Sequence, residues 1–401
     1  MPFISDRTIL HCDANCFFAS VETVFHPEYK SVPMAVCGSQ EDRHGIVLAK
    51  NDLAKACGVT TGEVIWQAKQ KCPSLVIAKP HYELYTQFSK EMGRIFYDYT
   101  DMIEPFGIDE SWLDVTASRK YFGDGISIAE KIRSRVKSEL GITVSIGVSF
   151  NKVFAKLGSD LKKPDAITVI GRDDFRQKLY GLPISDMLFV GAKTKAALSR
   201  VGIYTIGDVA GCKRQYLISL LGKTGGELWD NANGLDISEV SKEGYADRAK
   251  SVSNGMTFKR NLRTQSDISF AVYYLADEVA KRLRATNARC RCVAINLRLP
   301  DLSHVGKQMT VAPTCLAADI AKYVLGMIPL IHTGGEIYSL TVHTSDLIYG
   351  DEKQESIFEL EPGNKKMCDL EYAVDGIHSR YGKGALKRAS GIMNELRASR
   401  K

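Results

Sequence analysis

GIDESWLD, Gly107–Asp114, decides the fold of this chain, because its adjacent carboxylates Asp109 and Glu110 lie within an apolar run. Burying an unpaired carboxylate costs several kcal/mol or makes the group take up a proton, so this run needs a positive partner. A third acid, Asp13, ends another apolar run near the N-terminus, within HCDANCFF, 11–18. Three carboxylates supplied by two buried strands favour one or two hard divalent cations.

The composition predicts a globular protein with several domains. At 401 residues the chain exceeds one ordinary core, so we expect two to four domains. It has no long apolar run and no charged-then-apolar leader, so we expect no membrane span, no signal peptide and a cytoplasmic location. The ten cysteines match no CxxC zinc or redox spacing and indicate reduced, buried thiols.

The segments up to residue 172 predict an α+β domain. A short strand at 6–12, a helix at 81–100, a strand at 111–115, a helix at 126–141 and a strand at 142–149 follow one another. With a strand before the bend at Pro105, the order becomes β-α-β-β-α-β, the ferredoxin-like arrangement, with an inserted module at 17–82. Adjacent Asp109 and Glu110 would face opposite sides of a flat strand, so we expect a turn there, which Gly107 permits.

Two further stretches indicate contacts with phosphate. The helix expected from Asn151 carries several lysines (Lys152, Lys156, Lys162 and Lys163), which either neutralise a bound polyphosphate or form a solvated basic face. In MLFVGAKTKAALSRVGIYTIGDVA, 187–210, helices on either side of a VGAKT turn predict a helix-hairpin-helix that grips DNA phosphates. A plain helical hairpin with a glycine cap is the alternative, and residues 217–234 resemble a weaker second copy.

The C-terminal third is basic. The formal net charge is +6, and residues 248–298 hold eleven Lys and Arg, Arg284 among them, against three acids. Strands at 251–258, 292–299 and 336–347 with a helix at 273–285 predict a second α+β domain, whose basic face favours nucleic acid. We expect an exposed linker at 233–250 and a helical end at 370–390.

In combination, these motifs resemble a Y-family DNA polymerase. The resemblance is carried by DANCFFASVE, 13–22, by IDES, 108–111, by NKVFAKLGSDLKKP, 151–164, and by VGAKTKAALSRVGIYTIGD, 190–208. It implies a multidomain right hand: a palm at 1–16 and 83–172, fingers at 17–82, a thumb at 173–240, a linker at 241–247, a little finger at 248–350 and a tail at 351–401. It also implies a monomer that adds deoxynucleotides to a primer 3′-OH on a DNA template, with low fidelity and bypass of damaged bases.

The resemblance implies a role for each matching residue. Two Mg²⁺ ions would be held by Asp13, Asp109, Glu110 and the carbonyl of Ala14, while Asn15 would not be a ligand. Phe17, Lys55 and Lys163 would contact the deoxynucleoside triphosphate, and Phe18 would be the steric gate against a 2′-OH; composition alone favours core packing for both phenylalanines. Met34 and Leu48 would roof the nascent base pair. The residues expected to contact primer-template DNA are Gly191, Lys193, Thr194, Gly202, Thr205, Arg260, Arg289 and Arg291.

The sequence departs from the family pattern near the nucleotide. Asp52 and Lys55 stand where the family has a tyrosine and an arginine, and Gly107 replaces the usual serine. These departures motivate an alternative, a catalytically weak DNA-binding relative. A ferredoxin-like nucleotide cyclase shares the paired acids, but it leaves the hairpin turns and the basic domain unexplained. In the tail, Gln354, Ser356, Ile357 and Phe358 resemble a peptide that docks on a sliding clamp; the alternative is a polar loop.

Overall fold

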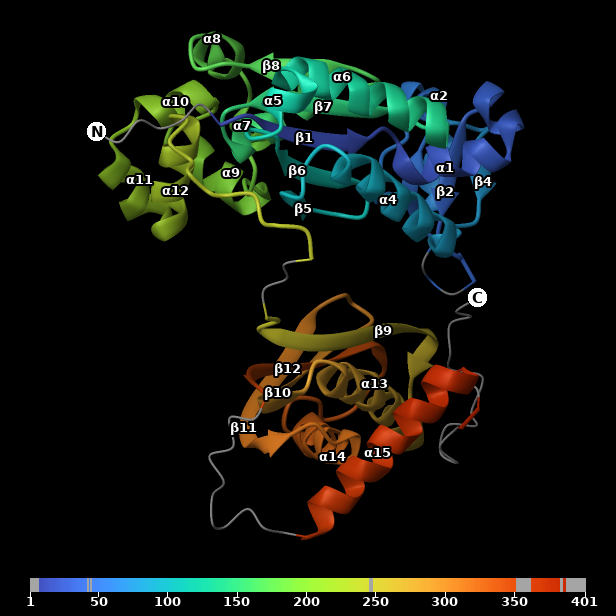
Figure 1. Cartoon of the computed structure of the whole chain (residues 1–401). Helices are drawn as coiled ribbons and strands as arrows, with labels where there is room; N and C mark the ends of the chain where they lie inside the picture. Colours follow the sequence, from blue (N-terminus) through green and yellow to red (C-terminus); the bar gives the residue numbers. More distant parts are fainter. Residues whose placement is uncertain are drawn as a thin grey trace. The chain divides into compact units, whose positions relative to one another are not determined.

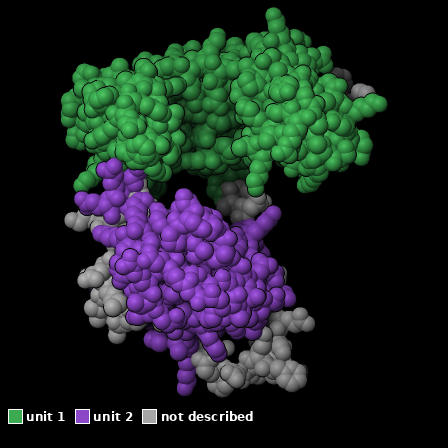
Figure 2. All heavy atoms as spheres, turned by 180° about the vertical axis from the view of Figure 1, so that it is seen from behind, with its two compact units in different colours: residues 1–38, 46–245 green, residues 39–45, 246–401 purple. Residues whose placement is uncertain are grey.

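The chain forms two compact units. The structure is a computed structural model that describes residues 7–41, 43, 45–244, 248–350, 362–382 and 385–386 (Figure 1). The first unit comprises residues 1–38 and 46–245, and the second comprises residues 39–45 and 246–401 (Figure 2). Among the described residues, no helix is long and apolar enough to cross a bilayer.

The first unit is organised around β1 (Ile9–Ala14), a fully buried strand. It lies in a five-stranded sheet of order β5-β6-β1-β7-β8. The other strands are β5 (Ile103–Pro105), β6 (Glu110–Asp114), β7 (Val144–Ser149) and β8 (Ile167–Ile170). Strand β1 pairs antiparallel with both β6 and β7. This order confirms the ferredoxin-like palm, to which β8 adds a parallel edge strand.

Helices cover both faces of this sheet because the side chains of β1 alternate. Leu10, Cys12 and Ala14 join a core with helices α1 (Phe17–Phe25), α4 (Tyr82–Tyr97) and α6 (Gly125–Arg135). Helix α6 continues as a π-helical turn, Val136–Leu140. On the other face, α7 (Lys152–Leu161) packs against β1, β7 and β8. His11 and Asp13 point to this face, so α7 is the helix nearest to the acids.

Two glycines let α7 lie very close to the sheet. A Cβ on Gly147 of β7 would lie 1.9 Å from the carbonyl oxygen of Ala155, and one on Gly158 would lie 3.0 Å from the Cα of Gly147. Any side chain at Gly147 would push the helix outward. Asn151 begins the helix by accepting a hydrogen bond from the N–H of Phe154, as expected of an N-cap.

The module inserted after β1 has its own sheet of order β3-β2-β4. Its elements are the 3₁₀ helix η1 (Pro27–Ser31), β2 (Met34–Cys37), β3 (Val47–Lys50), α2 (Asp52–Ala56), α3 (Ile65–Lys71) and β4 (Val76–Ala78). Asn51 fixes the start of α2, because its side chain accepts from the N–H groups of Met34 and Ala54 and donates to two carbonyls.

The predicted thumb is helical. After α5 (Arg119–Phe122) in the palm, the chain forms α8 (Phe175–Leu179), η3 (Ile184–Asp186), α9 (Ala192–Ser199), α10 (Ile206–Gly211), α11 (Arg214–Leu221) and α12 (Lys223–Ala232). The helix expected before VGAKT is only the 3₁₀ turn η3, because Phe189 has a φ of 68° that a helix cannot include. The second hairpin turns at Gly222, whose φ is 67°.

The expected linker is partly packed. Val240 is buried with Ile9, Trp112 and Ala155 of the palm, and the N–H of Ser241 donates to Glu104 at 2.9 Å. The prediction of an exposed linker is therefore wrong around Val240. The segment is mostly polar, and the buried side chain of Val240 could not be recognised from composition. Residues 245–247 lie outside the described residues.

The second unit has a four-stranded sheet of order β11-β10-β12-β9. Its elements are β9 (Ser251–Leu262), α13 (Gln265–Ala285), β10 (Ala288–Arg298), β11 (His304–Thr314), α14 (Ala317–Met327), η4 (Ile328–Leu330), β12 (Ile337–Tyr349) and α15 (Pro362–Tyr381). Sequence patterns predicted the basic α+β domain but not β11 or α14. The terminal helix begins at Pro362 and ends before Gly382, whose φ is 85°.

Helix α15 docks onto α13 and α14 through a buried ion cluster. Arg284 of α13 pairs with Glu371, and its Nε donates to Asp375 at 2.7 Å. Glu371 also accepts from the N–H of Ala317, which starts α14. Arg284 is only 7% exposed, so this member of the basic cluster serves packing and is not available to nucleic acid.

Candidate active site

The three predicted acids converge at the end of the palm sheet. Asp13 on β1 is paired in register with Glu110 on β6. Asp109 lies in the turn before β6, and its carbonyl accepts from the N–H of Ala14 at 3.0 Å. The expected turn at Gly107 is present, because the N–H groups of Phe106 and Gly107 both point to the carbonyl of Glu110.

The electrostatics of the acids reflect their crowding. Burial, followed by repulsion from Asp13 and Glu110, raises the pKa of Asp109 to about 6. Two lysines supply the opposite charge: Lys156 Nζ lies 3.1 Å from Asp13 and 2.6 Å from Glu110, and Lys163 Nζ lies 2.9 Å from Asp13. Burial alone would lower the pKa of Lys156, but Glu110 and Asp13 raise it instead.

Lys152, from the same helix, turns elsewhere. Its Nζ pairs with Glu104 at 2.6 Å and lies 4.6 Å from the centre of the Trp112 ring. Lys156 of α7 and Lys163, just after the end of α7, therefore face the acids, and Lys152 does not. The sequence placed these lysines on one helix but could not tell which of them turn inward.

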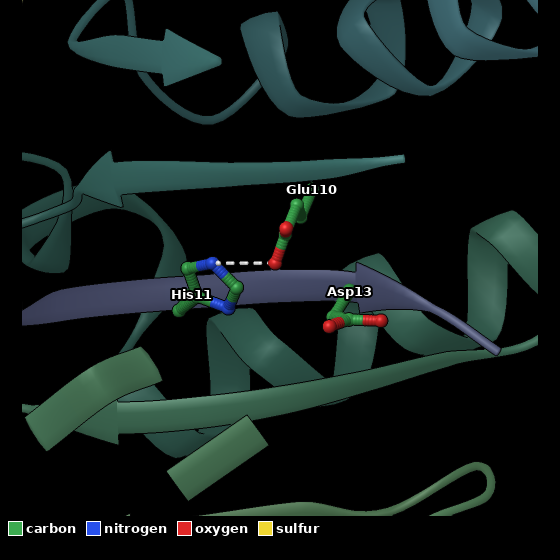
Figure 3. Close-up of side chains that lie close together, drawn as sticks. All are labelled: His11, Asp13 and Glu110. Atoms are coloured by element: carbon green, nitrogen blue, oxygen red, sulfur yellow. Dashed lines mark ion pairs between the residues drawn. The ribbon is translucent and has the colours of Figure 1, made fainter. Parts of the chain in front are cut away.

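A histidine that sequence reasoning missed lies beneath the acids. His11 is fully buried, with Nε2 3.4 Å from Glu110 Oε2 (Figure 3) and Nδ1 2.9 Å from Ser159 Oγ. Ligand atoms of His11, Asp13 and Glu110 all lie within 4.8 Å of one another. Burial, followed by the charges of Lys156 and Lys163, lowers the pKa of His11, so the ring is neutral. Its only signal in the sequence was a polar residue inside a buried strand.

Phe18 lies on α1 beside the acids, with its ring partly exposed. It stacks on Tyr85 of α4 with ring centres 4.1 Å apart and planes 12° apart. The Tyr85 hydroxyl donates to the buried carboxylate of Glu22, which His81 also contacts at 2.9 Å. The position of Phe18 is thus fixed by a network whose members, Tyr85 and Glu22, sequence reasoning did not single out.

Two residues that were predicted to contact the nucleotide or the base pair, Phe17 and Met34, have buried side chains. The side chain of Phe17 is buried, so only its backbone at the start of α1 is available to a nucleotide. Met34 is completely buried in the palm core, which contradicts its expected role as a roof of the base pair. Leu48 on β3 is only half-buried and remains available for that role. Phe17 lies on the inward face of α1, and Met34 lies on β2, all four residues of which are buried, whereas only the first residue of β3 is buried.

The departures from the family pattern lie around the site. Asp52 is exposed, and its Oδ1 lies 3.9 Å from Cys16 Sγ at the start of α1. The Nζ of nearby Lys50 donates to the hydroxyl of Thr61. Lys55 is exposed on α2. A Cβ on Gly107 would lie 3.3 Å from Asp109 Oδ1, so a side chain there would touch the acids directly.

The helix-hairpin-helix offers one open helix N-terminus. Helix α9 starts at Gly191 without a side-chain cap, and Lys193 and Thr194 lie in its first turn. Helix α10 is closed, because Thr205 and Asp208 form a capping box, and Asp208 also takes the N–H of Tyr204. Thr205 therefore serves as a cap, and the acid beside it disfavours the predicted phosphate contact. Gly202, with a φ of 78°, makes the turn between the helices.

The predicted basic residues of the second unit differ in their partners. On β10, Ala288 and Cys290 face the helices, whereas Arg291 is exposed and Arg289 partly exposed. Arg291 Nε lies 3.6 Å from Asp346. Arg260 forms a two-pronged pair with Asp267, at 2.9 and 3.0 Å, which anchors the start of α13.

A carboxylate-bearing palm, a helix-hairpin-helix and a separate basic domain together define a DNA polymerase of the right-hand class. Two family models match the chain: the impB/mucB/samB family over residues 12–160 and its C-terminal domain over residues 249–357. A relative from Acetivibrio thermocellus, named DNA polymerase IV, is 45% identical over 385 residues and covers 95% of this chain and 96% of its own.

Another relative, DNA polymerase IV 2 of Bacillus subtilis, is 32% identical over 397 residues, covering 97% of this chain and 95% of its own. A solved Y-family DNA polymerase chimera superposes with a TM-score of 0.75 at 25% identity, covering 86% of this chain and all of its own. The chain belongs to the impB/mucB/samB family of Y-family DNA polymerases, and it is a DNA-directed DNA polymerase. The resemblance seen in the sequence is confirmed, and the alternative of a catalytically weak relative is not favoured.

Proposed function

We propose that this chain is a low-fidelity polymerase that extends a primer 3′-OH on damaged as well as intact templates, using two Mg²⁺ ions held by Asp13, Asp109, Glu110 and the carbonyl of Ala14. The observation that carries the proposal is the convergence of three carboxylates at one end of the palm sheet. Carboxylate oxygens are the donors that Mg²⁺ prefers, so the residues present fit the ion. When bound, the ions would activate the primer hydroxyl and stabilise the leaving pyrophosphate.

The chain's own residues supply the other parts of the reaction. Lys156 and Lys163 neutralise the acids in the metal-free chain, and with cations bound to the acids Lys163 would be available to bind the triphosphate. The uncapped start of α1 offers further N–H donors to an anion, and Lys55 would add a point charge from α2. Phe18, held against Tyr85, would exclude a ribose 2′-OH.

DNA contacts are proposed at two surfaces. The open start of α9, with Gly191, Lys193 and Thr194, would hold backbone phosphate without reading sequence. The strand face of the second unit that carries Arg289 and Arg291 would add a basic contact. Affinity for primer-template should therefore fall steeply with salt.

Primer extension by the full chain tests the metal site. Asp13→Ala and Glu110→Ala should each lower the rate by about a thousandfold or more, because several kcal/mol of transition-state stabilisation is lost. Asp114→Asn is the matched control, since Asp114 ends β6, the strand that begins with Glu110, and its carboxylate accepts a hydrogen bond from the N–H of Thr116. Extension that survives both alanine variants would refute the assignment of these acids.

We also propose that the chain acts as a monomer that docks on a sliding clamp through Gln354, Ser356, Ile357 and Phe358. These residues lie outside the described residues, so the sequence motif alone supports this proposal. Replacing Ile357 and Phe358 with alanine should remove stimulation by the clamp and leave clamp-free extension unchanged. Equal stimulation of variant and parent would contradict it.

A further inference from the structure

The surroundings of His11 are specific enough to suggest a task for it. The residue lies two positions before Asp13 on the same face of β1, completely buried. Its ring meets Trp112 edge-on with centres 5.2 Å apart, and its two nitrogens face different partners, Ser159 on one side and Glu110 on the other. A buried polar ring held on three sides has one orientation.

The hydrogen-bond partners select one tautomer of this ring. A neutral imidazole has a single N–H, and if Nδ1 carried it, the Nε2 lone pair would face the Glu110 carboxylate at 3.4 Å, which sets two acceptors against each other. With the proton on Nε2, the ring donates toward Glu110, and Nδ1 accepts the hydroxyl proton of Ser159 at 2.9 Å. Ser159 can also donate its hydroxyl proton to the carbonyl of Lys156 at 2.8 Å. The carboxylate of Glu110 favours the tautomer with the proton on Nε2, and in that tautomer the hydroxyl donates to Nδ1.

We infer that His11 is a positioning residue that holds one oxygen of Glu110, so that the other oxygen is presented to a metal ion. Lys156 takes the same oxygen, Oε2, at 2.6 Å, and His11 Nε2, 3.4 Å from that oxygen, is left without a hydrogen-bond partner among the described residues. With a cation bound in place of Lys156, the imidazole N–H would be the partner of Glu110 on the strand side. This inference rests on the proposed metal site.

Ser159 has a place in the same arrangement. It is fully buried on α7, one turn after Lys156, so a single helix carries both the residue that sets the tautomer of His11 and the lysine that competes for Glu110. Partners of metal-binding carboxylates act in this way in other proteins, and their loss typically weakens metal binding or activity about 10–100-fold.

The test compares variants of the full chain. His11→Phe keeps the ring volume but removes both nitrogens, and His11→Gln restores a donor at about the place of Nε2. Ser159→Ala removes the partner of Nδ1, and Ser149→Ala, a buried hydroxyl on β7 that bonds the carbonyl of Ile170, is its matched control. Two quantities are measured: the Mg²⁺ concentration at half-maximal single-turnover extension, and Mn²⁺ binding without DNA by electron paramagnetic resonance.

We expect His11→Phe to raise both metal midpoints by about 10–100-fold, Ser159→Ala to raise them less, and His11→Gln to recover most of the loss. Midpoints of His11→Phe equal to those of the parent would overturn the inference, and if Glu110→Ala were then inactive, the proposed metal site would still stand. If His11→Phe does not fold, as judged by circular dichroism, Ser159→Ala decides: parental midpoints for that variant overturn the role of the imidazole. Activity surviving in Glu110→Ala would instead count against the proposed function itself.

Discussion

Replacing Asp109 with Asn should stabilise the metal-free protein while abolishing polymerisation. Asp109 lies beside Asp13 and Glu110, and its pKa rises from an ordinary value of 3.8 to about 6, through burial first and repulsion second. The folded chain therefore keeps a proton on this group at a pH where the unfolded chain has released it. Folding then becomes less favourable as the pH rises.

The size of the effect follows from the gap between the two pKa values, which corresponds to about 3 kcal/mol. Because Asp109 is only partly buried and relaxation is possible, we expect about 1–2 kcal/mol from the substitution. The penalty is absent below about pH 4, grows up to about pH 6 and is constant above about pH 7. Parent and Asp109→Asn should accordingly have equal stability in acid and diverge toward neutral pH.

Urea unfolding in EDTA, followed by tryptophan fluorescence, measures the difference in unfolding free energy between the parent and Asp109→Asn for the first unit. All three tryptophans, Trp66, Trp112 and Trp229, lie in the first unit, so the signal reports the unit that contains the site. Asp114→Asn serves again as the control. A stability difference that does not change between pH 4 and pH 8, or a variant less stable than the parent at neutral pH, would refute the reasoning.

Three further predictions concern the gate and the second unit. Phe18→Val should raise ribonucleotide incorporation about a hundredfold in single-nucleotide extension, because a smaller side chain admits the 2′-OH; unchanged discrimination would contradict the gate. Arg284→Met should lower the urea unfolding free energy of the second unit, followed by circular dichroism, by about 3 kcal/mol, because it leaves two carboxylates unpaired; a loss below about 1 kcal/mol would argue against the ion cluster. Contact with Arg260, set against burial, lowers the pKa of Asp267, so its stabilising contribution is present above about pH 4 and lost in acid. The difference in stability between Asp267→Asn and the parent should thus be largest at neutral pH and shrink as the pH falls below about 4, and a difference of the same size at pH 7 and pH 2 would contradict this assignment.

Much of the site was predictable from the sequence because strand ends and glycine turns leave local signals. Asp13, Asp109 and the basic helix followed from such patterns. The contacts between side chains did not follow from the sequence, because they depend on strand register and on how the elements pack. Arg284 was counted in the basic cluster of residues 248–298, because its acidic partners lie about ninety residues further along the chain.

The contacts of His11 and Tyr85 could not be predicted either, because they also depend on register and packing. In the sequence, His11 is a polar residue inside an apolar strand, and Tyr85 is an aromatic residue on an amphipathic helix. Their tasks became visible only when β1 was paired with β6 and α1 was packed on α4. Met34 shows the opposite error, since a family position predicted exposure where the fold buries the side chain.

The contact between Gly147 and Gly158 determines how far Lys156 has to reach to the acids. Helix α7 lies close to the sheet because Gly147 and Gly158 have no side chains. From this position Lys156 pairs with both Asp13 and Glu110. A single methyl group at Gly147 would lift the helix and withdraw the lysine, although every charged residue would stay in the sequence. A change that disturbs the acid cluster can therefore fall at a position that has no chemistry of its own.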